Sequence, residues 1–412
     1  MAAMGERAKA AKEAMRLATA QQKSAAIHAM AYALRANQEA LLQANAKDVA
    51  HATAQQQTPA RIDRLRLDAK RVTDICDALQ VIADYREPVG RVLETVTRPN
   101  GLRIEQVTVP LGVIGVIYES RPNVTADAAA LAIKAGNTII LRSSSECLNS
   151  AVCIATILRD ALAQHGLPKD SLQIIDQPGY DYVDAMLQAS DVIDVMVPRG
   201  GKSLIERVNQ KARMPVFSHL DGVCHIYVAR QADLQKAQDL VVDAKLRRVT
   251  VCGALETLLV DQSLADEFLP RVLLALREKG CEIRGCERTQ AIDNTVIPAS
   301  AQDWVCEYLD AILSIRIVDD LDMAIAHINH HGSHHTDTIV TEDDEMAVRF
   351  MNEVDSAIVM HNASTQFADG NEFGKGGEIG IATGRIHARG PVGCDELTCF
   401  HYRVHGSGQC RA

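Results

Sequence analysis

The chain has few aromatic residues, fewer positive than negative charges, and no long apolar run. Phe, Trp and Tyr make up 4% of the 412 residues, with a single tryptophan, Trp304, so the core must be built from aliphatic side chains. Scarce aromatics also argue against a platform that stacks nucleobases. Lys and Arg number 43 against 53 Asp and Glu, a net charge of −10, which excludes a general binder of nucleic-acid backbones. A site that binds an anion must therefore be formed by a small group of basic residues, because the surface as a whole is negative.

Membrane and secretion signals are missing as well. No apolar run reaches the roughly 18 residues of a transmembrane helix, and the residues from Met1 to Arg7 contain no apolar signal segment. The 11 cysteines, an odd number, are scattered without a pairing framework, which indicates reduced thiols and a cytoplasmic protein. An apolar content of 47% is typical of a folded protein, and the length predicts about two to three domains.

The apolar periodicity predicts a helical layer followed by two series of alternating strands and helices. Up to about residue 85, apolar residues such as Ala8, Ala11 and Met15 recur at helical spacing. Short apolar strands with helical crossovers follow, which is typical of parallel sheets covered on both faces. The first series has predicted strands at 113–118, 138–141, 172–175, 192–197 and 216–218. The second has predicted strands at 223–228, 254–260, 312–318, 338–340 and 357–360.

Residues Val92–Val109 alternate in polarity on both sides of Arg98-Pro-Asn-Gly101, which predicts a β-hairpin. A two-stranded ribbon is marginally stable alone, so its face needs a partner. It is either a flap on its own domain or an oligomerisation arm. We expect the arm, in a homodimer or dimer of dimers, with the ribbon lying on a neighbouring subunit or pairing with the strand-like segment Leu397–Val404 there.

Two glycine-rich segments suggest a nucleotide site but do not match the usual fingerprints. Pro198-Arg-Gly-Gly-Lys-Ser203 lacks the first glycine of a Walker loop, because Met196 stands there. Gly200 and Gly201 therefore form either a phosphate-binding turn or an ordinary turn between a strand and a helix. Residues 374–380 do not have the spacing of the dinucleotide fingerprint. A nicotinamide cofactor would bind without it.

Cys252 is the cysteine whose surroundings favour reactivity. It follows Lys245-Leu-Arg-Arg248 and precedes a predicted strand, and cationic neighbours favour the thiolate. The alternative is a structural thiol, the commoner role of a cysteine. Asn123, just after the strand 113–118, either caps the next helix or points its amide at a developing oxyanion.

Histidines gather in HINHHGSHH, residues 327–335. The spacing of His327, His331 and His335 could place a metal on a helix, but Gly332 and Ser333 interrupt it. No carboxylates are spaced around the cluster to complete a ligand set. We expect a polar turn and no metal site.

As a set, seven segments closely resemble the γ-glutamyl phosphate reductase family, a branch of the aldehyde dehydrogenase superfamily. They are GVIGVIYESRPNVTADAAALAIKAGNTIILR, VPRGGKSLI, HLDGVCHIYV, VCGALETLLV, HINHHGSHHTDTIVTED, VDSAIVMHNASTQFADG and GEIGIATGRIHARGPVG. The resemblance runs essentially from end to end. It implies an α/β fold of the aldehyde dehydrogenase type, with two Rossmann-like parallel-sheet domains and a β-ribbon oligomerisation element. The implied activity is NADPH-dependent reduction of L-glutamyl 5-phosphate to L-glutamate 5-semialdehyde, with release of phosphate, in proline biosynthesis.

The resemblance also implies roles for catalytic and substrate-binding residues. Cys252 would be the nucleophile that forms a thioester, and Asn123 would hold the oxyanion together with the Cys252 backbone N–H. His219 falls near the position of the superfamily's hydrolytic base, which fits a reaction in which phosphate, and not water, exchanges with the acyl group. The candidate cations for the substrate's charges are Arg121, Lys245 and Arg248.

Five further positions would hold the cofactor, NADPH or NADP⁺. Arg142 falls where the superfamily contacts the adenosine ribose. Ser145 replaces a carboxylate of NAD-specific relatives and leaves room for the 2′-phosphate. Gly200 and Gly201 would lie under the nicotinamide-side phosphates, and Glu307 would hold the nicotinamide ribose.

The segment before the cysteine departs from the family pattern, since Val249 and Thr250 replace a Pro-Gly pair. Asp243 and Arg247 change the local charge, and Ser143-Ser144 replace a Gly-Gly. Two alternatives therefore stand beside the main hypothesis: an enzyme of the superfamily with a shifted acyl substrate, and a weakened paralogue that serves as a binding partner.

The expected domains follow from the two series of strands and the resemblance. A cofactor-binding domain would comprise residues 1–91 and 111–222, with 362–390 returning to it. Residues 223–361 would form the catalytic domain, and 92–110 with 391–412 the oligomerisation element. Expected partners are the acyl phosphate, further copies of the chain in a dimer or tetramer, and glutamate 5-kinase, with no nucleic acid and no membrane.

Overall fold

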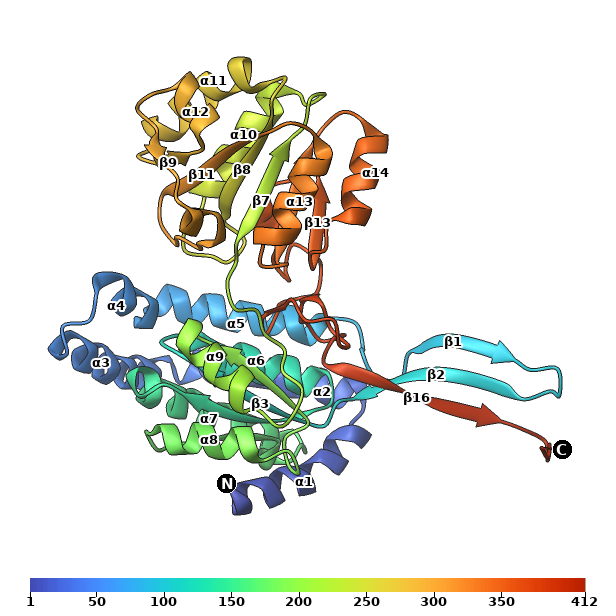
Figure 1. Cartoon of the computed structure of the whole chain (residues 1–412). Coiled ribbons are helices and arrows are strands. Elements are labelled where there is room, and N and C mark those ends of the chain that lie inside the picture. The colour runs from blue at the N-terminus through green and yellow to red at the C-terminus, as the bar shows by residue number, and fades with distance from the viewer. Residues whose placement is uncertain (412) are drawn as a thin grey trace. The chain divides into compact units, whose positions relative to one another are not determined.

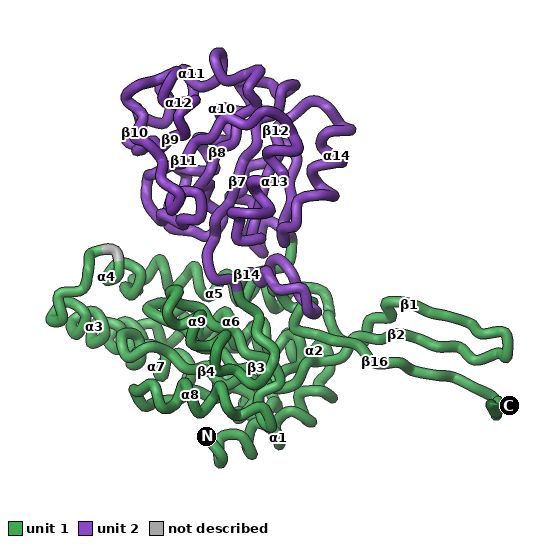
Figure 2. Tube along the Cα trace, viewed as in Figure 1, with its two compact units in different colours: residues 1–218, 374–380, 392–412 green, residues 219–373, 381–391 purple. Residues whose placement is uncertain are grey.

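A computed structural model describes residues 1–411, apart from the side chain of residue 60. The chain forms two compact units, shown in Figure 1 and coloured separately in Figure 2. Unit 1 contains Met1–Ser218, Gly374–Gly380 and Val392–Ala412, and unit 2 contains His219–Phe373 and Ile381–Pro391. The chain first passes from unit 1 to unit 2 between Ser218 and His219, four residues before the expected domain boundary at 222 and 223. Its C-terminal part then alternates between the units. The cofactor-binding and catalytic roles of the units stay predictions.

Unit 1 is built on a four-stranded parallel sheet in the order β5-β4-β3-β6. Its strands are β3 (Val113–Tyr118), β4 (Thr138–Ser143), β5 (Leu172–Ile174) and β6 (Val195–Arg199). Every residue of β3 and β4 is buried, as expected of strands covered on both faces. One core cluster joins β3, β4 and β6 to α1 (Ala2–Leu17), α8 (Tyr180–Gln188) and α9 (Lys202–Lys211).

The predicted N-terminal helical layer is confirmed. The remaining helices of unit 1 are α2 (Ala20–Ala36), α3 (Gln38–Ala54), α4 (Pro59–Leu65), α5 (Ala69–Asp84), α6 (Asn123–Lys134) and α7 (Leu148–Gln164). Met15, Met30 and Leu79, which lie on the predicted apolar stripes, are completely buried. Helix α2 begins at a capping box, in which the Thr19 side chain accepts from the Gln22 N–H and the Gln22 side chain accepts from the Thr19 N–H.

Unit 2 contains a seven-stranded parallel sheet in the order β10-β9-β11-β8-β7-β12-β13. Its strands are β7 (Cys224–Val228), β8 (Leu255–Asp261), β9 (Glu282–Gly285), β10 (Ile297–Pro298), β11 (Ile312–Val318), β12 (Thr336–Val340) and β13 (Ile358–His361). One core cluster contains side chains of α10 (Leu234–Leu246) and α11 (Ala265–Glu278). A second contains side chains of α13 (Leu321–His331) and α14 (Asp344–Glu353). The sheet is therefore covered on both faces.

The remaining elements of unit 2 are short. They are α12 (Glu287–Ile292) and the antiparallel pair β14 (Ile381–Ala382) and β15 (Gly390–Pro391). Strands β9 and β10 were not predicted from the sequence, because they have four and two residues and lack an apolar run. The predicted strand at 216–218 is wrong, since only a single bridge joins Val216 to Met196.

The predicted hairpin is present and is extended by a third strand. Strands β1 (Val92–Thr97) and β2 (Arg103–Pro110) pair antiparallel, and Gly101 at the tip has φ +86°, a conformation that favours glycine. Strand β16 (Thr398–His405) pairs antiparallel with the whole of β2. Figure 1 shows these strands projecting away from the helices of unit 1. The pairing is within one chain, so the prediction of pairing with Leu397–Val404 of a neighbouring subunit is corrected.

Candidate active site

Cys252 lies in a tight turn of unit 2, just before β8. The Ala254 N–H donates to the Val251 carbonyl oxygen at 3.0 Å, which closes the turn around the cysteine. Gly222 lies directly against it, since a Cβ at this position would stand 2.1 Å from the Cys252 carbonyl oxygen. Only glycine therefore fits at position 222.

The Gln366 side chain holds the loop between α10 and Cys252 in place by hydrogen bonds. Gln366 Nε2 donates to the carbonyl oxygens of Ala244 at 2.9 Å and Arg248 at 3.2 Å, at the end of α10. The Val249-Thr250 segment, where the family pattern has Pro-Gly, follows this anchor directly. The backbone before the thiol is thus held by a side chain and not by a proline.

Two imidazoles lie beside the Cys252 thiol. His219, Cys252 and His335 each present one nitrogen or sulfur atom, and these atoms all lie within 4.8 Å of one another. The two imidazole rings meet edge to face, with centroids 5.0 Å apart. His219 is half-buried, whereas His335 is completely buried. The cluster therefore combines a thiol, a closed-off imidazole and a partly accessible one.

Hydrogen bonds determine which ring nitrogen of each histidine can face the Cys252 thiol. His219 Nδ1 lies 2.7 Å from the Ile381 carbonyl oxygen, which can only accept, so Nδ1 carries a proton and Nε2 is the nitrogen left for the sulfur. His335 Nδ1 lies 2.9 Å from the Thr336 hydroxyl. His335 Nε2 is buried and has no hydrogen-bond partner.

The electrostatics favour the thiolate of Cys252. Burial raises the pKa of this thiol, but His335 and His219 lower it by more through charge and hydrogen bonding, so that it lies well below its ordinary value. Neighbouring Cys224 donates its S–H to the Cys252 carbonyl oxygen at 3.1 Å, and burial raises its pKa well above the usual range. Of these two adjacent thiols, only Cys252 is prepared to act as a nucleophile.

In the described part of the chain, His219, Cys252 and His335 also form the one group of metal-ligating side chains compact enough to hold an ion. A metal there would occupy the sulfur. We therefore interpret the cluster as a device for thiol chemistry.

Glu307 belongs to the same neighbourhood. Burial, and next the charge of Cys252, raise the pKa of its carboxyl group, while a hydrogen bond from the Gly222 backbone opposes the shift. Unit 2 therefore brings together the predicted nucleophile and the residue predicted to hold the nicotinamide ribose.

The two basic residues predicted before Cys252 differ in their surroundings. Lys245 is completely buried, its Nζ lies 2.6 Å from Glu256 Oε2, and the ammonium lies over the ring of Tyr308. Glu256 already engages this ammonium, so Lys245 is unsuited to bind a substrate phosphate. Arg248, by contrast, is exposed. We keep Arg248 and Arg121 as the candidate substrate cations.

Asn123 and Arg121 lie in unit 1 at the start of α6. Asn123 is the first residue of the helix and forms no side-chain cap, so the N-cap alternative is wrong. Its Nδ2 donates instead to Asp127 Oδ2 at 2.9 Å, one turn along the helix. Burial raises the pKa of Asp127 to about 6, against the opposing effects of Asn123 and Arg199. Arg121 is exposed.

The four predicted cofactor residues of unit 1 lie at the carboxyl ends of β4 and β6, where α/β sheets bind ligands. The Gly201 N–H donates to Glu119 Oε2 at 2.9 Å, which shows that this turn offers its N–H to an anion. A Cβ at Gly200 would stand 2.5 Å from Glu119 Oε2 and 2.7 Å from Leu204 Cδ2, so the carboxylate can lie against this turn only because the residue is glycine.

Arg142 and Ser145 complete this set at the end of β4. Arg142 is buried, its Nη2 donates to the Gly179 carbonyl oxygen at 3.2 Å, and its Nε has no partner. Ser145 begins a short 3₁₀ turn and is exposed. A glycine turn that holds a carboxylate, a buried cation with an unused donor and an exposed hydroxyl are compatible with a dinucleotide.

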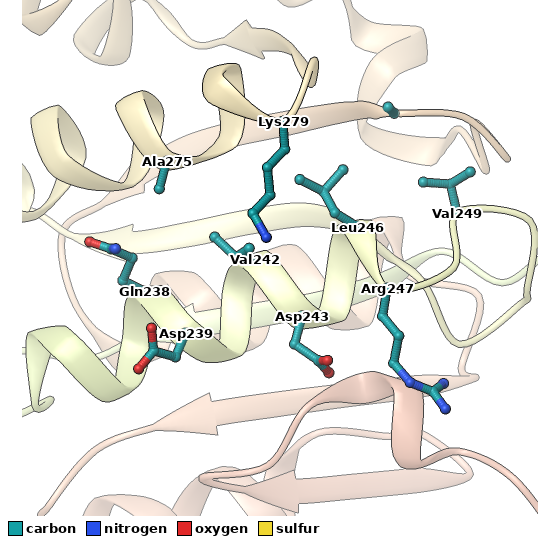
Figure 3. A pocket seen from close by; sticks show the side chains of 10 residues that line it. Gln238, Asp239, Val242, Asp243, Leu246, Arg247, Val249, Ala275 and Lys279 are labelled. Atoms are coloured by element: carbon teal, nitrogen blue, oxygen red, sulfur yellow. The ribbon is translucent and has the colours of Figure 1, made fainter.

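A hollow of about 670 Å³ lies elsewhere in unit 2. Figure 3 shows Ala275 and Lys279 on one side of it, facing Val242 and Leu246 on the other. Asp239, Asp243 and Arg247 also line it, so its charges are mixed. It contains neither Cys252 nor the two imidazoles, and we assign it no catalytic role.

Sequence reasoning did not identify several residues that shape this site. His335 was counted with a polar turn, and Gly222, Gln366 and Asp127 carried no local signal. His335 and Gly222 lie far from Cys252 in the sequence, and only the folded chain brings them into contact with it. A single sequence offers no spacing rule for such contacts.

Comparison with known proteins gives a consistent family. The model of the aldehyde dehydrogenase family matches residues 1–310. "Gamma-glutamyl phosphate reductase" of Methylorubrum populi is 55% identical over 412 residues, covering 100% of this chain and 95% of the relative. The protein of the same name from Rhodospirillum rubrum is 55% identical over 99% of this chain and 96% of its own.

A solved structure agrees with this relationship. The crystal structure of gamma-glutamyl phosphate reductase from Thermotoga maritima has a TM-score of 0.97 and 41% identity, covering 99% of both chains. The aldehyde dehydrogenase type of α/β fold, with its parallel sheets, is thereby confirmed. From the matched family model, the full-length relatives and this fold, the chain belongs to the γ-glutamyl phosphate reductases of the aldehyde dehydrogenase family.

Proposed function

We propose that this chain catalyses the NADPH-dependent reduction of L-glutamyl 5-phosphate to L-glutamate 5-semialdehyde, with release of phosphate. The full-length relatives carry the name of this activity. The observation in the chain itself that carries the proposal is the Cys252 thiol, which His219 and His335 hold in its reactive form. Such a thiolate can attack an acyl phosphate and form a thioester.

Each candidate site residue has a separate proposed role in this reaction. Cys252 attacks the acyl carbon, while Asn123 and the Cys252 backbone N–H are proposed to hold the developing oxyanion. Arg121 and Arg248 are proposed to bind the negative charges of the substrate. The nicotinamide cofactor, when bound, supplies the hydride that converts the thioester to the aldehyde.

The family uses nicotinamide cofactors, and we propose NADPH as the one used here. Ser145 has no charge to repel a 2′-phosphate, and Arg142 lies near the end of β4, the strand that precedes Ser145. The Gly200-Gly201 turn would carry the phosphates and Glu307 the nicotinamide ribose.

Three wider expectations belong to the proposal. The 11 free thiols suit a reducing cytoplasm. An acyl phosphate must be supplied by a kinase, which makes glutamate 5-kinase the proposed upstream partner. The projecting β1-β2-β16 sheet is proposed to join copies of the chain. The structure itself, over residues 1–411, contains no helix long and apolar enough to cross a membrane.

An assay of the reverse reaction tests the activity against both alternatives. We expect NADPH to form from glutamate 5-semialdehyde, phosphate and NADP⁺. Faster turnover with another aldehyde would favour the enzyme with a shifted acyl substrate. Absence of turnover with a panel of aldehydes, in a folded protein, would favour the non-catalytic paralogue and contradict the proposal.

A further inference from the structure

We propose that His219 takes the proton of the Cys252 thiol and delivers it to the departing phosphate, while His335 stays in place as a hydrogen-bond donor to the sulfur. The inference deepens the proposed function and rests on it. The two imidazoles beside Cys252 then have different tasks: His219 carries the proton, and His335 holds the charged sulfur.

The need for such a path follows from the chemistry of the bond that breaks. When the thiolate attacks, a C–S bond forms and the C–O bond to phosphate breaks. The leaving oxygen takes the bonding electron pair and needs a proton to depart as hydrogen phosphate. The thiol has just lost one proton, so the balance closes if that proton moves from the sulfur to the phosphate through an intervening base.

Burial decides which imidazole carries the proton. His335 is completely enclosed, so its ring has no route to a substrate oxygen, and a charge on it stays beside the sulfur. His219 is half-buried and can meet both the sulfur and a bound phosphate. The moving proton is therefore assigned to His219.

The bonds of His219 suit this task. Its Nδ1–H donates to the Ile381 carbonyl oxygen at 2.7 Å, which fixes the ring and leaves Nε2 to accept the thiol proton. Once Nε2 is protonated, each nitrogen of the ring has an acceptor. Nδ1–H donates to the Ile381 carbonyl oxygen, and Nε2–H donates first to the sulfur and then to the phosphate. The imidazolium is thus stabilised without any rotation of the ring.

The bonds of His335 suit a fixed donor. Its Nδ1 lies 2.9 Å from the Thr336 hydroxyl, which can donate to it, and its buried Nε2 has no hydrogen-bond partner. An Nε2–H directed at the sulfur would satisfy this otherwise unused group when the sulfur is charged. The low pKa of Cys252 is consistent with both contacts.

Two measurements separate thiolate formation from proton delivery. Iodoacetamide reacts with a thiolate and releases iodide, which needs no proton in order to leave. Alkylation of Cys252 by iodoacetamide, followed by mass spectrometry without cofactor, reports thiolate formation alone. Turnover of the acyl phosphate reports thiolate formation together with proton delivery. We compare both rates at about pH 6.5, where an unassisted thiol is mostly protonated.

The variants His335→Gln and His219→Gln should behave differently. His335→Gln should slow alkylation and turnover by the same factor, about tenfold or more for each unit by which the thiol pKa rises. His219→Gln should slow turnover by about 10²–10⁴, well beyond its effect on alkylation. The control His330→Gln, at an exposed position of α13, should leave both rates unchanged.

Rescue separates chemistry from damage to the fold. Imidazole added to His219→Ala should restore part of the turnover with acyl phosphate, which a purely structural loss would not allow. Equal losses of turnover and alkylation in His219→Gln, or wild-type alkylation in both variants, would overturn the inference. A wild-type protein that does not turn over acyl phosphate would overturn the proposed function and the delivery step, while its alkylation profile would still decide the thiolate step.

Discussion

At the scale of single residues, the amide of Asn123 depends on its neighbour Asp127. The carboxylate accepts one N–H of the amide at 2.9 Å, and the other N–H is the one proposed to hold the oxyanion. Because burial raises the pKa of Asp127 to about 6, this acceptor is ionised at neutral pH and loses its charge as the pH falls through that value. The orientation of the amide is therefore best defined above about pH 6.

Substitutions test this pair. Asn123→Ala should lower kcat by about 10²–10³, the usual loss for one oxyanion donor. Wild-type kcat should fall below about pH 6, where Asp127 loses its charge and no longer holds the amide. Asp127→Ala should cause a smaller loss than Asn123→Ala, since the amide remains, and should remove this fall. Asp160→Ala, on exposed α7 surface, is the control. A loss in Asn123→Ala that only follows a lower melting temperature would contradict the oxyanion role.

Ser145 tests the choice of cofactor. NADPH should be preferred over NADH in kcat/KM, because no carboxylate at this position repels the 2′-phosphate. Ser145→Glu should erode the preference by restoring that repulsion. Ser145→Gln, which has the size of Glu without its charge, should largely keep it. Equal kcat/KM for the two cofactors in the wild type would show that Ser145 does not select NADPH.

Cys252 could be singled out from sequence because basic residues precede it and because its segment resembles a known family. Of the two histidines that favour its thiolate, the resemblance placed His219 near the site, whereas no local signal indicated His335. Lys245 is turned inward to Glu256, and the thiolate is supported by His219 and His335, which approach from distant parts of the chain. Local spacing reports neighbours along the chain, whereas a pKa depends on neighbours in space.

At the scale of elements, α10 is tied to β8 by the buried pair of Lys245 and Glu256. Both side chains are fully enclosed, and Lys245 Nζ lies 2.6 Å from Glu256 Oε2. Burial raises the pKa of Glu256 to about 8 against the attraction of the Lys245 ammonium, so the pair adds little net stability, but removing Lys245 leaves the buried carboxyl group without its partner. The pair therefore fixes α10, and with it the loop before Cys252, more than it adds net stability.

A double-mutant cycle measures this effect. Lys245→Met should lower the free energy of unfolding by about 3–5 kcal/mol, and Lys245→Met/Glu256→Leu should recover most of it. The exposed pair of Lys236 and Glu342 is the control, where Lys236→Met should cost about 0–1 kcal/mol. If Lys245→Met were stable and only raised KM for the acyl phosphate, the buried pair would not be structural and Lys245 would be a substrate ligand.

The hairpin illustrates what elements can be predicted. Its Asn-Gly tip and alternating strands indicated β1 and β2 correctly, because both signals are local. Its third strand was recognised as strand-like, but its pairing within the chain was missed, because β16 lies almost 300 residues later in the sequence. Strands β9 and β10 were missed because each is shorter than a usual apolar run.

At the scale of the whole molecule, the β1-β2-β16 sheet presents an apolar face. Phe400, Tyr402 and Val404 alternate along β16, so they share one face, and their exposed fractions are 48%, 63% and 58%. Val404 and Phe400 pair with Ile104 and Thr108 of β2. Exposed apolar surface of this kind is typical of a protein interface.

We predict that Tyr402→Lys/Val404→Lys converts an oligomer to monomers. Charges on this face would have to be buried in the interface without partners. His401→Lys, on the opposite face of the same strand, is the control and should leave the oligomer intact. Sedimentation at micromolar concentration distinguishes the states. A wild type that is already monomeric would contradict the oligomerisation role of the ribbon.

The division of the chain into two units could be predicted only in part. The crossing near residue 219 was expected from the change between the two series of strands. A return of residues 362–390 to the cofactor-binding domain was expected, whereas only Gly374–Gly380 of this segment belongs to unit 1. The bounds could not be predicted, because Gly-rich segments carry little periodicity.

The central claim is that Cys252 carries the acyl group and that phosphate releases it. The most direct measurement mixes the protein with glutamate 5-semialdehyde and NADP⁺ in the absence of phosphate. We predict a burst of NADPH of about one equivalent per chain, with a glutamyl adduct on the Cys252 peptide by mass spectrometry, and steady turnover only after phosphate is added. Steady turnover without phosphate, or a burst without an adduct on Cys252, would contradict the account.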